Sequence, residues 1–272
     1  MRGACDRIAA IAGNTYREAI RMRLFLLLAV SGIVSLVGGL YFQEFNLGSS
    51  ELRFIADFGF GAMTLLGSIV TVVATVQLLY GEIEHRTILP ILSKPVSRGE
   101  FLLGKLLGAW LTICSFIGIL TLALLAALWI RQWQMPDLGE EALLEQGAVS
   151  SSGVLLFALM QCFRLMVLAS VTAFFSAYAS SSLFAVFMGF FVWVIGQLRG
   201  SLDAQWGEGI GQSLLKTLTL LIPDFRIFDL GAYAFGEAEA SLVSLLGLVL
   251  YAVVYAALYG SLAAVVLKNR EF

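Results

Sequence analysis

Long stretches without charged side chains constrain this chain more than any other feature. Five windows of 16 to 26 residues contain no Asp, Glu, Lys or Arg, and a sixth contains a single Arg. A helix needs about 20 apolar residues to cross about 30 Å of hydrocarbon. Six such spans take up nearly half of the 272 residues, which leaves no room for a soluble catalytic domain of ordinary size. We therefore predict an all-α, polytopic membrane protein with six transmembrane helices.

The predicted spans follow these windows, except that one long uncharged run is divided between two spans. Residues 165–198 form a run of 34 residues without charge. As one helix this run would be about 51 Å long, which exceeds the bilayer core. The polar stretch 177–182 favours a break, so the run contributes to a fourth and a fifth span. The predicted spans are 24–42, 58–81, 106–130, 154–178, 183–198 and 242–267.

The distribution of positive charge predicts the orientation. Segments 1–23, 82–105 and 268–272 together hold 11 of the 17 Lys and Arg residues but only 6 of the 19 acidic ones. Lys and Arg accumulate in the short cytoplasmic loops of membrane proteins. We therefore expect cytoplasmic N- and C-termini, which six spans also require. The expected location is a cell membrane, with the bacterial cytoplasmic membrane as the first choice.

Two segments outside the spans have unusual patterns. Residues 1–23 place apolar and charged side chains on opposite faces of a helix too polar to span, which is typical of an amphipathic helix in the membrane interface. Residues 199–241 are extracytoplasmic in this topology, yet 214–222 are largely apolar. Nine residues cannot span a bilayer. An amphipathic surface helix and a re-entrant element both fit this stretch, and the sequence does not decide between them.

The sequence offers no enzyme site. Residues 99–105 match most of a phosphate-binding loop, G-x4-G-K, but Leu106 stands where a Ser or Thr would hold magnesium, and no strand precedes Gly99. The single histidine, His85, excludes a multi-histidine metal centre, and three widely spaced cysteines form no ligand cluster. We therefore expect no catalytic, cofactor-binding or metal-binding residues in this chain.

The segment 82–105, between the second and third spans, has the features of a partner-binding loop. Its residues 87–92 are apolar enough for about one and a half helical turns, and charged residues flank them on both sides. Pro95 predicts a turn, and Ser97 can cap a helix that begins near Arg98, with Glu100 in its first turn. A solvated connector would explain the charges but not the apolar run, whereas a partner protein would bind such an exposed patch.

The pattern E-x-E-x-R-T-(x)5-S-K-P-V-S-R-(x)6-K in residues 82–105 resembles the first cytoplasmic loop of type-2 exporter ABC transporter permeases. The interfacial N-terminal helix, the six spans and the apolar segment before the sixth span also match that family. The chain departs from the pattern at 85–87, where many members have Arg-Gly-Thr and this chain has His-Arg-Thr. Arg in place of Gly restricts the backbone at the start of the loop helix.

The resemblance implies a permease subunit that forms the translocation pathway and is driven by a separate ATPase. It implies two ABC ATPase subunits and a second permease copy or homologue as partners, in contact with membrane lipid and without nucleic acid. ATP and magnesium would then be bound by the ATPase and not by this chain. The inner turn 180–182 would form a second, smaller contact. The residues that would couple this chain to the ATPase are Glu82, Glu84, Arg86, Thr87, Leu89, Leu92, Pro95, Arg98 and Lys105.

Arg164 is the one charged residue inside a predicted span. Charges at such depth are costly, and they are usually paired or face a cavity. Arg164 could line the pathway and attract an anionic group. Alternatively, it could be held by Gln161 one turn earlier, or by a carboxylate such as Asp57, Asp224 or Asp229. Both interpretations stay open at this point.

Other functions are less well supported by the residues. A secondary transporter or channel would predict an inverted repeat and several intramembrane ionisable groups, of which the sequence shows only Arg164. A membrane-embedded enzyme lacks a set of catalytic residues. A non-transporting membrane anchor for a soluble complex would share the partner-binding loop and is the hardest alternative to separate. The generic apolar spans do not indicate a substrate.

Overall fold

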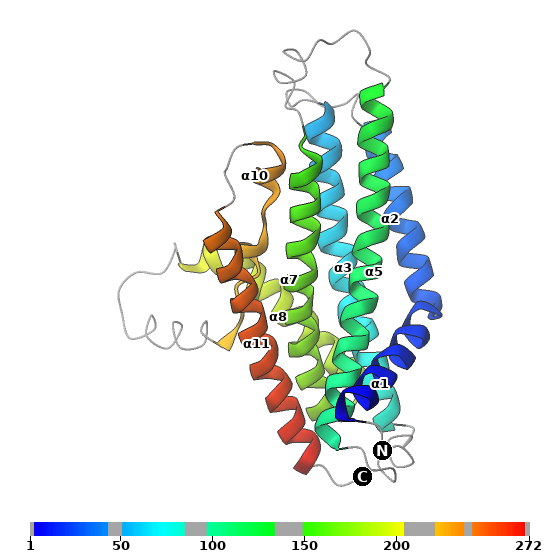
Figure 1. Ribbon diagram of the computed structural model, residues 1–272, viewed down its shortest axis with the longest axis vertical. Coiled ribbons are helices and arrows are strands. Elements are labelled where there is room, and N and C mark those ends of the chain that lie inside the picture. Colours follow the sequence, from blue (N-terminus) through cyan, green and yellow to red (C-terminus); the bar gives the residue numbers. More distant parts are fainter. Residues whose placement is uncertain are drawn as a thin grey trace.

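The computed structural model describes residues 3–42, 51–84, 97–133, 149–203, 221–236 and 241–269. Within these ranges the chain forms helices and no strands (Figure 1). Six of the helices are long and apolar enough to cross a membrane, which confirms the all-α polytopic fold. The elements are α1 (Ala4–Ile20), α2 (Arg23–Phe42), α3 (Glu51–Glu84), α5 (Arg98–Trp133), α7 (Ser151–Tyr178), α8 (Ser182–Asp203), η2 (Arg226–Phe228), α10 (Gly231–Ala234) and α11 (Leu242–Asn269).

Several helices extend beyond the windows from which the spans were predicted. The helix α3 begins at Glu51, seven residues before the second window, and α5 begins at Arg98, eight residues before the third. A window ends at the first charged residue, whereas a helix continues for as long as its backbone hydrogen bonds do. The chain between the second and third spans is therefore shorter than 82–105, since Glu82 and Glu84 belong to α3 and Lys105 belongs to α5.

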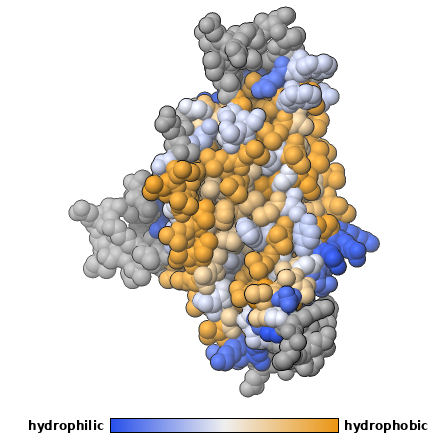
Figure 2. Space-filling view, in the orientation of Figure 1, coloured by the Kyte–Doolittle hydropathy of each residue, from blue (hydrophilic) through white to orange (hydrophobic). Residues whose placement is uncertain are grey.

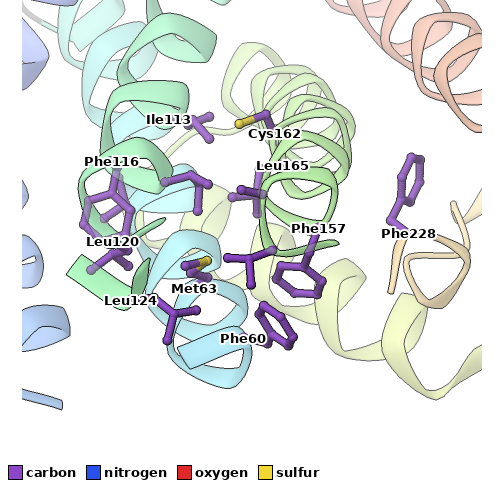
Figure 3. Packing of buried hydrophobic residues seen from close by; sticks show 14 of the residues in the cluster. Phe60, Met63, Ile113, Phe116, Leu120, Leu124, Phe157, Cys162, Leu165 and Phe228 are labelled. Carbon is purple, nitrogen blue, oxygen red and sulfur yellow. The ribbon is translucent and has the colours of Figure 1, made fainter. Parts of the chain in front are cut away.

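The helices α3, α5 and α7 form the centre of the bundle. Their facing side chains make up the main apolar core, where Phe60 stacks on Phe157 at 4.1 Å between ring centroids (Figure 3). Phe116, Leu120 and Leu165 are also fully buried there. In contrast, α2, α8 and α11 expose many large apolar side chains, which form the orange surface in Figure 2. An apolar exterior over an apolar core is expected of a bundle whose solvent is lipid.

The helix α1 lies outside the six spans and packs closely on α5. Its small residues Ala12, Thr15 and Ala19 are buried. Opposite them, Gly104 and Gly108 leave so little space that a Cβ atom on Gly108 would lie 2.5 Å from Cβ of Thr15. Small residues four apart let two helix backbones approach closely. The structure thus identifies α1 as the helix that packs against Gly104 and Gly108.

Residues 221–236 pack into the bundle rather than on its surface. Phe225 and Phe228 are fully buried, and a Cβ atom on Gly196 of α8 would lie 2.4 Å from the ring of Phe225. Tyr259, about 25 Å along α11 from its first residue, donates a hydrogen bond to the carbonyl of Leu221 at 2.5 Å. Further along the segment, the carbonyl of Ala234 accepts a hydrogen bond from the backbone N–H of Ser150, just before α7.

The segment 221–234 therefore runs from an interior level of α11 back to the outer end of α7. Tyr251, about 13 Å along α11, accepts a hydrogen bond from the backbone N–H of Asp224 at 2.9 Å, between these two levels. The described part of this segment is thus held by hydrogen bonds to α11 and to the residue before α7, while both interpretations of 214–222 stay open. Residues 204–220, which include most of the apolar stretch at 214–222, lie outside the described residues.

Candidate functional site

The first two turns of α5 bring together side chains from four parts of the chain. The helix begins with a capping box, in which Ser97 Oγ accepts from the backbone N–H of Glu100 at 3.2 Å and the Glu100 carboxylate accepts from the N–H of Ser97 at 3.0 Å. The predicted cap is thus confirmed. Around this start lies a set of charged side chains that we call the α5 base cluster: Arg7, Glu18, Glu82, Arg98, Glu100 and Lys105.

Two contacts tie α1 to this cluster. The Arg7 guanidinium donates to Glu100 Oε1 at 2.6 Å and to Oε2 at 3.3 Å, in a paired geometry that is among the stronger ones for arginine. The hydrogen bonds to Glu100 raise the pKa of the Arg7 guanidinium above its ordinary value. At its other end α1 places Glu18 3.6 Å from Nζ of Lys105.

Lys105 is the buried centre of the cluster. Its side chain is only 3% exposed, and its ammonium lies 2.6 Å from Oε1 of Glu82 in the last turn of α3. A buried ammonium without a counter-ion would carry a large desolvation cost. The pair therefore holds the end of α3 against the second turn of α5.

Arg98 connects the same region to the last span. Its guanidinium donates to the backbone carbonyls of Leu267 at 2.6 Å and Lys268 at 2.8 Å. These carbonyls belong to the final turn of α11, where they have no partner further along the helix. The start of α5 is thus joined to α1, α3 and α11, so the first and the last described helices both contact α5 at the same end of the bundle (Figure 1).

The structure places four of the residues expected to couple this chain to an ATPase. Glu82 and Glu84 lie in the last turn of α3, while Arg98 and Lys105 lie in α5. Arg86, Thr87, Leu89, Leu92 and Pro95, together with His85, lie outside the described residues. The smaller inner turn is present between α7 and α8, where Tyr80 donates a hydrogen bond to the carbonyl of Ser180 at 2.7 Å.

Sequence reasoning missed Arg7, Glu18 and Glu100 as members of the cluster. Arg7 and Glu18 were assigned to the polar face of α1, and Glu100 was noted only as a residue of the first turn of α5. One signal was available, because the small residues Ala12, Thr15 and Ala19 of 1–23 match the small pair at 104 and 108. Docking these two faces would have brought the charges on α1 close to those on α5.

Arg164 is buried in the middle of α7, with 2% of its surface exposed. Its Nη1 donates to Oε1 of Gln161 at 3.2 Å, the neighbour expected from the i, i+3 spacing. Asp224 and Asp229 attract the guanidinium electrostatically, although neither forms an ion pair with it in the described structure. Asp57 instead lies 3.9 Å from Arg53. Nε of Arg164 and Nε2 of Gln161 have no hydrogen-bond partner among the described residues.

We expect Arg164→Met to leave the folded protein as stable as the wild type, within about 1 kcal/mol, or more stable. Replacing buried ionic groups by apolar side chains of similar size is often neutral or stabilising. The measurement is the midpoint of thermal unfolding of the purified chain in detergent. Gln161→Leu, alone and combined with Arg164→Met, is the control for the orphaned amide. A large loss of stability in Arg164→Met alone would show that Arg164 is held for structural reasons.

The α5 base cluster joins four helices and offers no catalytic chemistry. It contains carboxylates, guanidinium groups and an ammonium that neutralise one another, without a nucleophile or a proton-transfer pair in a cleft. The part of the chain that the structure describes has no group of three or more His, Cys, Asp or Glu residues that could hold a metal ion.

Comparison with known proteins identifies the family. The family model described as "ABC-2 family transporter protein" matches residues 9–271, which is almost the whole chain. The comparison with curated proteins found no match. The six apolar helices agree with a multi-pass membrane protein. The chain therefore belongs to the ABC-2 family of transporter proteins, as a non-catalytic membrane permease component of an ABC transporter.

Proposed function

We propose that this chain is the permease subunit of an ATP-driven exporter and that a separate ATPase drives it through segment 82–105. In this proposal two permease copies or homologues form the translocation pathway, and two ATPase subunits bind ATP and magnesium on the cytoplasmic side. Family membership supports an ABC ATPase as the kind of partner. We also propose the stoichiometry, the export direction, the coupling role of segment 82–105 and a location in the bacterial cytoplasmic membrane.

The α5 base cluster is the observation that carries the coupling proposal. Residues 85–97 join α3 to α5, so any partner bound there acts on the ends of both helices. Those ends are locked together by Lys105 and Glu82 at 2.6 Å. Because α3 and α5 also supply much of the main core, a displacement at 85–97 is passed into the bundle as a whole.

The same cluster extends the displacement to helices that residues 85–97 do not touch in sequence. Arg7–Glu100 carries it to α1, and the hydrogen bonds from Arg98 carry it to the end of α11. In this proposal the four helices move together at this end of the bundle. Separating them would leave charged side chains, above all the buried Lys105 ammonium, without their partners. This arrangement supports an energy-coupling role over the alternative of a passive membrane anchor, which would need no such connections.

Charge reversal at Glu84 or Arg98 tests the coupling. We expect Glu84→Lys and Arg98→Glu to lower the ATP hydrolysis of the assembled complex by about tenfold or more, since like charges placed across an interface cost several kcal/mol. The permease, carrying an affinity tag, is co-expressed with a candidate ABC ATPase and reconstituted in proteoliposomes. Both the amount of ATPase retained on the permease and the rate of ATP hydrolysis are measured.

Arg226→Glu is the matched control, because Arg226 is exposed and lies in η2, away from the α5 base cluster. It should retain the ATPase and its activity. Arg98 also binds the end of α11, so Glu84→Lys is the more specific of the two variants. If Glu84→Lys complexes retain and stimulate the ATPase as the wild type does, segment 82–105 is not the coupling element.

A further inference from the structure

A groove lined by arginines lies at the elbow between α1 and α2. It is open, has a volume of ≈ 630 Å³, and is lined by Asn14, Arg17, Glu18, Arg21 and Met22. We refer to it as the elbow groove. The elbow itself is tight, because the backbone N–H groups of Arg21 and Met22 bond to the carbonyls of Glu18 and Ala19 at 3.2 and 3.1 Å. These two hydrogen bonds fix the backbone of the turn that carries the lining residues Arg21 and Met22.

No carboxylate of the described residues forms an ion pair with the arginines at the elbow. Arg17, Arg21 and the adjacent Arg23 are exposed and form no ion pair in the described structure. Among the described residues that line the groove, Glu18 is the acidic one. Its carboxylate lies 3.6 Å from the Lys105 ammonium, which neutralises part of its negative charge. The elbow is thus an unbalanced cationic site.

Helix-end electrostatics explain only part of this arrangement. Arg17 and Arg21 lie at the C-terminal end of α1, where cations are stabilised by the helix dipole. Arg23 opens α2, and a cation is unfavourable at that positive end. An anion held in the elbow groove would interact favourably with Arg17 and Arg21, which line it, and with the N-terminal end of α2, where Arg23 lies next in the chain.

The surface directly beside the elbow indicates where that anion comes from. Leu26, Leu27, Val30 and Val34 of α2 are between 56% and 64% exposed and follow the elbow without interruption. Figure 2 shows the hydrophilic patch on this flank next to the apolar surface. One leaflet of hydrocarbon is about 15 Å thick, which corresponds to about ten residues of helix. Lipid chains lying along 24–34 would thus place their headgroup at the elbow groove.

We propose that the elbow groove binds the headgroup of an anionic phospholipid of the cytoplasmic leaflet. The phosphate lies among Arg17, Arg21 and Arg23, and the acyl chains cover the exposed face of α2. A zwitterionic lipid binds more weakly, because its own positive group opposes the three arginines. Since α1 carries both the groove and the contacts of Arg7 and Glu18 to α5, the bound lipid also keeps α1 seated on the α5 base cluster. This site does not depend on the ATPase or on the direction of transport.

Lipid titration of the full-length chain in detergent tests the proposal. The probes are a short-chain phosphatidylglycerol, a phosphatidylcholine with the same acyl chains, and inorganic phosphate. Native mass spectrometry counts bound lipids, and thermal unfolding reports stabilisation. We expect phosphatidylglycerol to bind preferentially and to raise the unfolding midpoint, with little effect of inorganic phosphate, which lacks the acyl chains.

The variant Arg17→Gln/Arg21→Gln should weaken phosphatidylglycerol binding by about 25-fold, or about fivefold for each arginine near a membrane surface. The matched control is Arg226→Gln/Lys268→Gln, which removes two exposed positive charges elsewhere and should bind as the wild type does. Arg17→Lys/Arg21→Lys keeps the charge and should retain most of the binding. If Arg17→Gln/Arg21→Gln does not fold, the single variant Arg21→Gln is compared with Lys268→Gln.

Two results would overturn the proposal. Equal binding of phosphatidylglycerol and phosphatidylcholine to the wild type would show that the arginines do not select an anionic headgroup. Equal loss of binding in the elbow variant and in the control variant would show a general effect of net charge rather than a site.

Discussion

Glu82→Gln will lower the free energy of unfolding by about 3 kcal/mol, because it removes the nearest counter-ion of a buried lysine. Lys105 is 3% exposed, and its ammonium lies 2.6 Å from Glu82 Oε1. The more distant and half-exposed Glu18, at 3.6 Å, compensates only in part. Breaking a buried ion pair costs more than the pair itself contributes, since one charge is left without a partner in a medium of low dielectric constant.

The double variant Glu82→Gln/Lys105→Met should recover much of this loss, because it removes both charges together. The measurement is an unfolding titration of the purified chain in mixed micelles for the wild type, both single variants and the double variant. Arg131–Glu51 supplies a matched control, since it has the same 2.6 Å separation but more exposed side chains. Glu51→Gln should therefore cost less than about 1 kcal/mol. A Glu82→Gln variant no less stable than Glu51→Gln would contradict the assignment of Lys105 as a buried centre.

Gly153→Ala is expected to be the most damaging single-methyl change in the described part of the chain. A Cβ atom at position 153 would lie 2.4 Å from Cα of Ala234 and 2.8 Å from its backbone nitrogen. A backbone contact of this kind cannot be relieved by a change of rotamer, so α10 must move away from α7. The hydrogen bond from the Ser150 N–H to the Ala234 carbonyl would be lost as well. We expect a cost of about 3 kcal/mol, at the upper end for overpacking.

Gly118→Ala is the control for this change. Gly118 is also a helical glycine, but no described atom outside its neighbours and the adjacent backbone of its own helix lies within 4 Å of its Cβ position. The substitution should be neutral or stabilise the protein by up to about 1 kcal/mol, because alanine favours a helix more than glycine does. Thermal unfolding and limited proteolysis of segment 221–236 compare the two variants. If Gly153→Ala were as stable as Gly118→Ala and equally resistant to protease, α10 would not be held at Gly153.

The helices were predictable because lipid imposes a simple requirement on them. A segment that crosses hydrocarbon must be apolar and must satisfy its backbone internally, so five windows free of charge and a sixth with a single Arg indicated all six spans. The break at 177–182 was also visible, and α7 ends at Tyr178 while α8 begins at Ser182. The neighbour of Arg164 was predictable for a similar reason, since Gln161 lies three residues earlier on the same helix.

Contacts between distant parts of the chain were not predictable from these patterns. Arg7 and Glu100 are 93 residues apart, and neither lies in a motif that indicates the other. Nothing in the sequence pairs Gly153 with Ala234 or Gly196 with Phe225, yet each glycine lies directly against its partner. Hydropathy and charge predict how many helices cross the membrane and in which orientation. Which helices pack against each other depends on the shapes of their apolar faces, and hydropathy does not distinguish these faces. The coupling role expected for the loop residues stays a prediction for Arg86, Thr87, Leu89, Leu92 and Pro95.

The way in which residues 221–234 are held has a consequence for the order in which the chain can be completed during synthesis. Gly196 and Gly153, which seat the segment from α8 and α7, precede it in the sequence, as does Arg199, which donates to the carbonyl of Ile222. Tyr251 and Tyr259, which bond to Asp224 and Leu221, are translated after it. In a nascent chain that does not yet include α11, the backbone N–H of Asp224 and the carbonyl of Leu221 therefore lack their native hydrogen-bond partners. The helix α11 thus completes the packing of a segment that precedes it in the sequence.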